Sequence, residues 1–289
     1  MPDAKPLLFL ALGAVTLVFL VAWVRSARRA PESARPGPLA LGIGFVTNFF
    51  DTLGIGSFAP TTSMWKLHGT VPDETIPGTL NVGHALPSIT QAFIFIAIVQ
   101  VEMTTLVGMI AAAVTGAWLG AGVVAAWPRR RIQVGMGLAL LAAASFFAMT
   151  NLQLFPSGGD TLGLRPPLLW AGIAGNLALG AFMTLGIGLY APCMILVALL
   201  GMNPRAAFPV MMGSCAFLMP IGSLRFVASG RYALEPAVGL TFGGVPAVLL
   251  AAFVVKSLPL TALRWLVVVV VLYAAFAMLR SARTTELEG

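Results

Sequence analysis

The sequence predicts an all-α polytopic membrane protein made of two inverted-topology repeats. Each repeat is expected to hold a re-entrant broken-helix hairpin and three transmembrane helices, and one extra N-terminal span precedes the first repeat. Three observations predict this architecture: a strongly apolar composition, a motif that occurs twice, and the placement of Lys and Arg at the ends of the apolar runs.

Composition excludes an ordinary soluble domain. Of the 289 residues, 58% are hydrophobic and 9% are charged, and the mean hydropathy is +0.94. The apolar runs are continuous rather than alternating, which indicates membrane-spanning helices rather than barrel strands. The formal charge of +7 comes from cations clustered at the ends of these runs. That placement is typical of cytoplasmic loops, so the expected partner is the lipid bilayer and not nucleic acid.

One motif occurs twice in the chain. Residues 52–60 read TLGIGSFAP and residues 184–192 read TLGIGLYAP, an offset of 132 positions. The register holds without a gap from Phe50 to Pro77, where 12 of 28 positions are identical to their counterparts. Since internal repeats decide architecture before other signals do, the chain is a duplicated unit.

Domain boundaries follow from this repeat. Residues 1–38 are an N-terminal transmembrane helix and a basic cytoplasmic linker, 39–150 are repeat 1, 151–166 an inter-repeat loop and 167–289 repeat 2. The first span, over residues 7–24, is retained with its N-terminus outside, because its positive charge follows the apolar stretch. The remaining expected segments are the two motif segments at 39–67 and 168–200 and the apolar runs at 79–99, 104–127, 132–150, 207–228, 233–255 and 260–279.

The positive-inside rule arbitrates between motif segments that cross the membrane and segments that turn back inside it. If both cross, cations divide nine inside to eight outside, and the cluster Arg129-Arg130-Arg131 faces outward. A mixed arrangement, with only the first segment re-entrant, gives eleven to six. If both are re-entrant, twelve lie inside and five outside, which favours this arrangement. The twelve are Arg25, Arg28, Arg29, Arg35, Lys66, Arg129, Arg130, Arg131, Arg225, Arg231, Arg280 and Arg283.

A re-entrant hairpin returns to the side from which it entered, so each repeat crosses the membrane three times, an odd number. The second repeat is therefore expected to be inverted relative to the first. The hairpin of repeat 1 then enters from the cytoplasm and that of repeat 2 from outside, and their turns can meet near the midplane. Inverted repeats with broken helices indicate a transport site at the repeat interface.

The motif itself has the chemistry of an anion site. Its glycines permit unusual backbone conformations, and Pro60 or Pro192 stands near the start of the next helix, where a missing N–H is no loss. The exposed N–H groups of residues 56–59 and 188–191 would attract an anion. The alternative is that the glycines only let helices pack closely. The expected substrate-binding residues are Thr52, Gly54, Ile55, Gly56, Ser57, Phe58, Thr184, Gly186, Ile187, Gly188, Leu189 and Tyr190.

Polar residues inside apolar runs are further candidates. Asp51 abuts the first motif and aligns with Met183, and it is expected either to accept a proton or to cap the turn. His84 is a candidate for proton relay or anion contact, with hydrogen-bonded packing as the alternative. Arg225 is expected to extend toward the interface or to contact an anion. Further candidate hydrogen-bond donors to an oxyanion are Asn48, Thr52, Thr184 and Ser214.

Other function classes have little support. The sequence holds no Walker A motif and no paired Cys or His cluster with metal-ligand spacing, so we expect no enzyme, no cofactor and no metal. One alternative stays open, a transmembrane thiol-disulfide electron carrier that uses Cys193 and Cys215. Against it, neither cysteine has a cysteine at the corresponding position of the other repeat.

The paired glycine motif after a basic linker resembles the TauE/SafE family of sulfite exporter-like membrane proteins, over about residues 40–280. The matching motif residues are Gly54, Gly56, Pro60, Gly186, Gly188 and Pro192. This resemblance implies a multi-pass carrier in the cytoplasmic membrane of a prokaryote that moves sulfite or small organosulfonates, generally outward. Neither Asp51 nor His84 carries over from the family. Together the motif chemistry and the resemblance predict a gradient-driven carrier, with protons as a candidate coupling ion, that works by alternating access.

Overall fold

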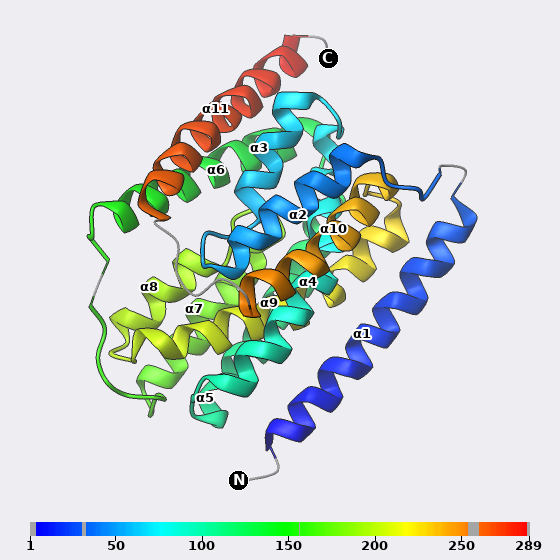
Figure 1. The fold of residues 1–289 in the computed structure, drawn as a ribbon. Coiled ribbons are helices and arrows are strands. Elements are labelled where there is room, and N and C mark those ends of the chain that lie inside the picture. Colours follow the sequence, from blue (N-terminus) through cyan, green and yellow to red (C-terminus); the bar gives the residue numbers. More distant parts are fainter. Residues whose placement is uncertain (1–3, 31–32, 156, 254–259, 288–289) are drawn as a thin grey trace.

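A computed structural model describes residues 4–30, 33–155, 157–253 and 260–287. Pro156 of the expected loop and residues 254–255 of one expected run lie outside this part of the chain. The described residues form a helical bundle without a named strand (Figure 1). Its helices are α1 (Ala4–Arg29), α2 (Pro38–Thr52), α3 (Phe58–His68), η1 (Asp73–Thr75), α4 (Ile76–Ile98), α5 (Met103–Val124), α6 (Arg129–Asn151), α7 (Leu168–Met183), α8 (Tyr190–Leu199), η2 (Pro204–Ala206), α9 (Ala207–Ser229), α10 (Leu234–Phe253) and α11 (Leu260–Leu287).

Seven of the described helical stretches are long and apolar enough to cross a membrane. One is α1, three belong to repeat 1 and three to repeat 2, as the apolar runs predict. The helices α7 and α8 are apolar but shorter. The protein is therefore a multi-pass membrane protein, and the motif segments differ from the spans in length.

Glycine interrupts both motif segments at corresponding places. Gly54 and Gly56 have φ of 90° and 87°, and they separate α2 from α3. Gly186, at φ 92°, lies in the break between α7 and α8. L-residues with a Cβ rarely adopt such φ values, so glycine is required there and the helix cannot continue. A Cβ atom added at Gly54, Gly56 or Gly188 would meet no neighbour within 4 Å, so close helix packing is not the role of these glycines in this structure.

The second motif segment folds back on itself. The side chain of Leu200, just beyond α8, lies over Gly172 of α7, and that of Leu196 lies over Gly175. The later residue of α7 thus contacts the earlier residue at the α8 end of the pair, which means that α7 and α8 run antiparallel. The segment therefore begins and ends at the same end of the bundle.

The first motif segment begins and ends at the opposite end of the bundle, which we call the basic end and define by residues 25–30, 33–37, 66–78, 127–133 and 225–236. Hydrogen bonds and ion pairs join these stretches. They are Gly37 N–H to Glu235 (2.6 Å), Lys66 to Asp73 (2.7 Å), Gln133 to Asp73 (2.9 Å), Arg129 to Glu74 (3.6 Å), Ser26 to Tyr232 (3.3 Å) and Arg231 to the Trp127 carbonyl. The start of α2 and the end of α3 thus lie together.

The far end joins the remaining connections. The Glu102 N–H donates to the Leu162 carbonyl at 2.8 Å, and the Asn203 N–H donates to the Thr161 carbonyl at 2.8 Å. These bonds hold the loop before α7 against the chain that leaves α8. The start of α7 and the end of α8 thus lie together.

Packing between the two halves is reciprocal. Helix α2 of the first repeat packs on α10 of the second, and the equivalent α7 packs on α5 of the first. The central pair is α4 against α9, and α6 packs against α11. Each of these contacts between a helix of the first repeat and a helix of the second has an equivalent in which the two repeats are exchanged. The halves therefore pack as the two subunits of an isologous pair do. Each motif segment is thus held by a span of the other repeat.

Small residues allow the close approach of these helices. Gly44 lies against Gly239 where α2 crosses α10, and Gly116 lies against the Leu177 carbonyl where α5 crosses α7. Without a hydrophobic driving force between helices in lipid, such backbone contact is a main source of association.

This packing predicts that Gly116→Ala destabilises the protein. The added methyl would collide with the Leu177 carbonyl, a backbone atom that cannot rotate away. Overpacking of this kind costs about 1–3 kcal/mol, so the thermal unfolding midpoint in detergent should fall by several degrees. Gly42→Ala on α2 is the matched control, because nothing lies within 4 Å of its added atom. Equal midpoints for the two variants would contradict the packing described.

Candidate functional site

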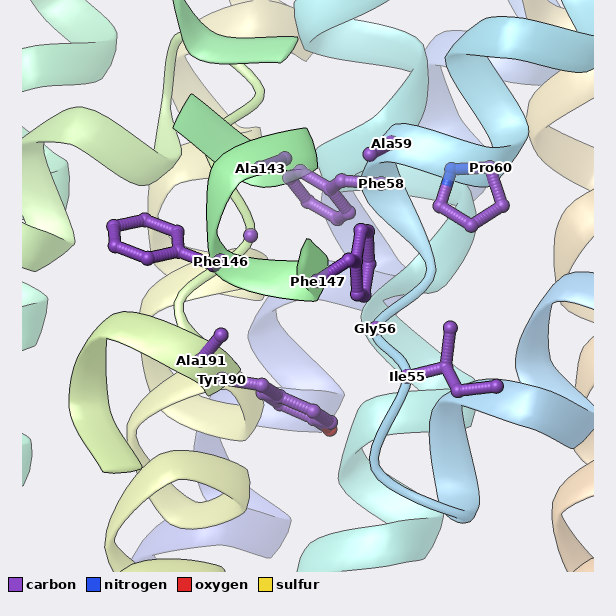
Figure 2. A pocket seen from close by; sticks show the side chains of 11 residues that line it. Ile55, Gly56, Phe58, Ala59, Pro60, Ala143, Phe146, Phe147, Tyr190 and Ala191 are labelled. Atoms are coloured by element: carbon purple, nitrogen blue, oxygen red, sulfur yellow. The ribbon is translucent and has the colours of Figure 1, made fainter. Parts of the chain in front are cut away.

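The two interrupted motifs meet in the interior. Their turns line one narrow cavity with α6, and each repeat contributes a glycine to it, Gly56 and Gly188. Figure 2 shows this cavity. The lining residues are Ile55, Gly56, Phe58, Ala59, Pro60, Ala143, Phe146, Phe147, Gly188, Tyr190 and Ala191. Figure 2 shows Phe58 and Phe147 toward the α3 side and Tyr190 below them, with its hydroxyl directed toward the chain at Ile55. The interruption of two distant segments thus creates one shared space.

A second cavity lies beside the first and shares Gly56, Phe58, Gly188 and Tyr190 with it. Its further lining residues are Asp51, Ser57, Ser88, Met183, Leu189, Cys215 and Met219. Both cavities have room for about one water molecule in this conformation. A larger ligand therefore requires the two motif segments to move apart.

The carboxylate of Asp51 lies at the N-terminal end of α3. It accepts hydrogen bonds from the N–H and the hydroxyl of Ser57, the residue before the helix. Gln91 Nε2 donates to Asp51 Oδ2 at 2.7 Å, and the Tyr190 hydroxyl lies 3.4 Å from the same oxygen. Such an arrangement places a negative charge at the positive end of the helix. The N–H of Ser57, which the sequence predicts to be free, is therefore occupied.

Tyr190 joins this network across the repeats. Its hydroxyl donates to Gln91 Oε1, and Gln91 Nε2 also donates to Thr52 Oγ1 at 3.0 Å. Asp51, Thr52 and Gln91 belong to the first repeat and Tyr190 to the second, so one hydroxyl connects the halves at the cavity. All of these side chains are buried.

The N-terminal end of α8 has no such carboxylate. Met183 stands at the position that Asp51 holds in the first repeat. Helix geometry leaves the first N–H groups of any helix without an intrahelical acceptor, and no side-chain oxygen among the described residues accepts from those of Leu189 or Tyr190. The two motifs are alike in sequence, but only the first repeat places a carboxylate of its own beside its helix end.

His84 holds the first broken helix together. Its Nδ1 lies 2.9 Å from Asn48 Oδ1 on α2, and its Nε2 lies 3.0 Å from Thr61 Oγ1 on α3. Asn48 Nδ2 donates to the Gly44 carbonyl, so Oδ1 must accept and Nδ1 of His84 carries the proton. Both ring nitrogens are engaged, and the side chain is fully buried away from the two cavities. This position fits the hydrogen-bonded packing alternative.

The other candidates lie around the site or away from it. Arg225 is exposed on α9, with its guanidinium 3.9 Å from the ring centre of Trp118, and it lines neither cavity. The Thr184 hydroxyl donates to the Ala181 carbonyl at 2.7 Å, and the Ser214 hydroxyl accepts from Asn176 at 2.9 Å. Both hydroxyls thus have partners within the protein.

Of the twelve residues expected to bind substrate, seven line the cavities and five, which are Thr52, Gly54, Thr184, Gly186 and Ile187, do not. Pro60 and Pro192 are the third residues of α3 and α8. Sequence reasoning missed Gln91, although an amide within the apolar run 79–99 is the same type of signal as His84. It also missed the aromatic pair Phe146 and Phe147, because apolar residues of α6 carry no sequence signal for a cavity.

Both cysteines are free and buried. Cys215 lines the second cavity, and its thiol lies 3.7 Å from Met183 Sδ. Cys193, on α8, lines neither cavity.

Comparison with protein families gives one match. The family model described as sulfite exporter TauE/SafE matches residues 2–147, half of the chain. The chain belongs to the TauE/SafE family. The match takes in α1 and nearly all of repeat 1, so it begins earlier and ends sooner than the resemblance seen in the motifs. No curated protein and no solved structure matches. The second half of this TauE/SafE protein is linked to the first by the internal repeat.

The position of His84 predicts a structural effect of His84→Ala. The change leaves the Asn48 carbonyl oxygen and the Thr61 hydroxyl buried without a partner, at about 1–3 kcal/mol each. We expect a clearly lower unfolding midpoint in detergent, measured by intrinsic fluorescence. His68→Ala serves as control, because that histidine is exposed and bonds only to the Met64 carbonyl one turn earlier. An unchanged midpoint for His84→Ala would show that the bridge between α2 and α3 contributes little.

Proposed function

We propose that this TauE/SafE protein is a secondary transporter that moves a small sulfur-containing anion, sulfite or an organosulfonate, across the cytoplasmic membrane of a prokaryote. The observation that carries the proposal is the meeting of the two interrupted motifs at one cavity, with one positive helix end left open. Family membership supports the substrate class. Broken helices with binding at their half-helix ends recur in secondary transporters.

The site is suited to bind an anion and to release it again. The N-terminal end of α8 offers N–H donors and a positive dipole end. No Lys or Arg side chain lines either cavity. A buried permanent cation would hold a small anion strongly, whereas dipoles and N–H groups bind it more weakly. Weak binding is what a carrier needs, because it must release the anion on the other side of the membrane.

In the membrane, we place the basic end in the cytoplasm because Lys and Arg are enriched in cytoplasmic loops. The first motif segment then enters from the cytoplasm and returns there, and the second enters from outside, so the repeats are inverted. The contacts at the two ends of the bundle support this orientation. Alternating access follows if one repeat rocks against the other and opens the shared cavity to one side at a time.

Asp51 gives this site its dependence on protons. A substrate anion at the α8 end would lie near the Asp51 carboxylate, since both line the second cavity with Tyr190. Like charges at such a distance repel strongly in a low-dielectric interior. Protonation of Asp51 removes the repulsion and favours anion entry. The outward direction is favoured by an inside-negative potential, at about 2.3 kcal/mol per charge per 100 mV.

The first test is uptake of labelled sulfite into proteoliposomes. Wild-type protein should give saturable uptake, and Gly188→Leu should reduce it at least about tenfold, since a side chain at this position enters the cavity that Gly188 lines. Gly188 has a negative φ and open space around it, so the change adds bulk without backbone strain. Gly42→Leu is the control, an exposed position with equally open space. Equal uptake by Gly188→Leu and Gly42→Leu would place the pathway elsewhere.

A second prediction concerns Asp51→Asn. Asparagine keeps the size of the side chain and its hydrogen bond to Ser57 but carries no charge, so it resembles the protonated carboxyl. We expect sulfite uptake that no longer changes with an imposed pH gradient, while wild-type uptake does change. Uptake by the variant that follows the gradient as wild type does would remove Asp51 from proton coupling.

A further inference from the structure

Three sulfur-containing side chains line the second cavity. Met183, Cys215 and Met219 all line it, and they are among the most deeply buried side chains of the protein. The Cys215 thiol lies 3.7 Å from Met183 Sδ, and the Ser88 hydroxyl donates to Met219 Sδ at 3.3 Å. We call these three side chains the sulfur wall. They come from α7 and α9 of the second repeat, so one repeat supplies the whole wall.

The N-terminal end of α8 lies at the same cavity. Gly188, Leu189 and Tyr190 bring the open N-terminal end of α8 to it. The sulfur wall and this helix end are part of one site, because the same cavity touches both. The site therefore combines a surface suited to oxyanion oxygens with a polarisable surface that has few strong hydrogen-bond donors.

The two repeats differ most at this point. In the first repeat Asp51 places a carboxylate beside its helix end, and in the second repeat Met183 places a thioether at the corresponding position. A thioether neither repels an anion nor competes with it for the N–H groups. It is soft and polarisable, and it makes favourable contacts with other polarisable groups.

We propose that the sulfur wall makes this site selective for anions with an exposed, polarisable sulfur, and specifically that it prefers thiosulfate to sulfate. The inference rests on the proposed transport function and names its substrate more closely. Thiosulfate and sulfate are both tetrahedral dianions, and they differ only in one terminal atom, sulfur in place of oxygen. With three oxygens at the α8 end, the fourth terminal atom faces the sulfur wall.

The physical reason is a difference in what each terminal atom requires. A terminal oxygen of sulfate needs strong donors when it leaves water, and the sulfur wall offers only the weak S–H donor of Cys215. A terminal sulfur is larger and more polarisable, and it accepts that weak donor while contacting both thioethers. An oxyanion placed against this wall leaves part of its charge without partners, which is how a site rejects a close analogue.

Competition against labelled sulfite uptake in proteoliposomes tests the inference. For wild type, thiosulfate should inhibit at a concentration at least about tenfold lower than sulfate does, a typical discrimination for one altered group in a pocket. The readout is the ratio of the two inhibition constants, which does not depend on the overall rate. In the combined variant Met183→Leu, Cys215→Ala, Met219→Leu the cavity stays apolar but loses its sulfur atoms. Its ratio should fall toward the value that the different hydration of the two anions alone would give. We expect a fall of at least about threefold from the wild-type ratio, which is the smallest change that we would count as clear.

The matched control is Met212→Leu. Met212 is a fully buried methionine of α9 that does not line the cavity, so this variant should keep the wild-type ratio. If the combined variant fails to fold, Met183→Leu alone conserves volume and usually costs less than about 1.5 kcal/mol. It should lower the ratio in the same direction.

The outcomes separate the two proposals. If sulfite is taken up but thiosulfate and sulfate inhibit equally, the selectivity is overturned and the transport function stands. The same conclusion follows if the combined variant keeps the wild-type ratio. Absence of sulfite uptake by folded wild type overturns the sulfite carrier. In that case thermal stabilisation of the purified protein decides the selectivity. A larger shift with thiosulfate than with sulfate, lost in the combined variant and kept in Met212→Leu, supports it, and equal shifts overturn it.

Discussion

The need to satisfy backbone groups at two helix interruptions inside an apolar bundle governs this structure. A chain that breaks its helix in such a place exposes N–H and C=O groups that water cannot reach. Here the breaks are placed opposite each other, so that each helps to enclose the other. The reciprocal packing of α2 on α10 and of α7 on α5 follows, since each interrupted segment is held by an intact span of the other repeat.

The first interruption is satisfied almost completely from within the chain. Asp51 occupies the end of α3, Gln91 and Thr52 complete its hydrogen bonds, and His84 connects the helices on both sides of the break. The second interruption lacks a carboxylate and an imidazole at the corresponding positions. The duplicated motif has thus diverged: the first copy is surrounded by polar side chains of its own repeat, and the second copy lacks their equivalents.

Tyr190 connects these two parts physically. Its hydroxyl reaches Gln91 and Asp51 of the first repeat from the first turn of α8, at the edge of both cavities. Any movement that separates the motif segments must break these bonds. In the transport function that we propose, an anion bound at α8 and a proton bound at Asp51 would act on the same few hydrogen bonds, which would couple the two.

The sequence by itself determined the number and order of the helices, the place of both breaks and the duplication of the unit. These features depend on local rules, since an apolar run must be helical in lipid and glycine at positive φ ends a helix wherever it stands. Only the tertiary structure decided that Gln91 and Tyr190 complete the environment of Asp51, that His84 bridges α2 and α3, and that Met183, Cys215 and Met219 share a cavity. The contacting pair Tyr190 and Asp51, for example, lies 139 positions apart in the sequence. No local pattern specifies which of them meet, because that depends on how helices from two repeats pack against each other.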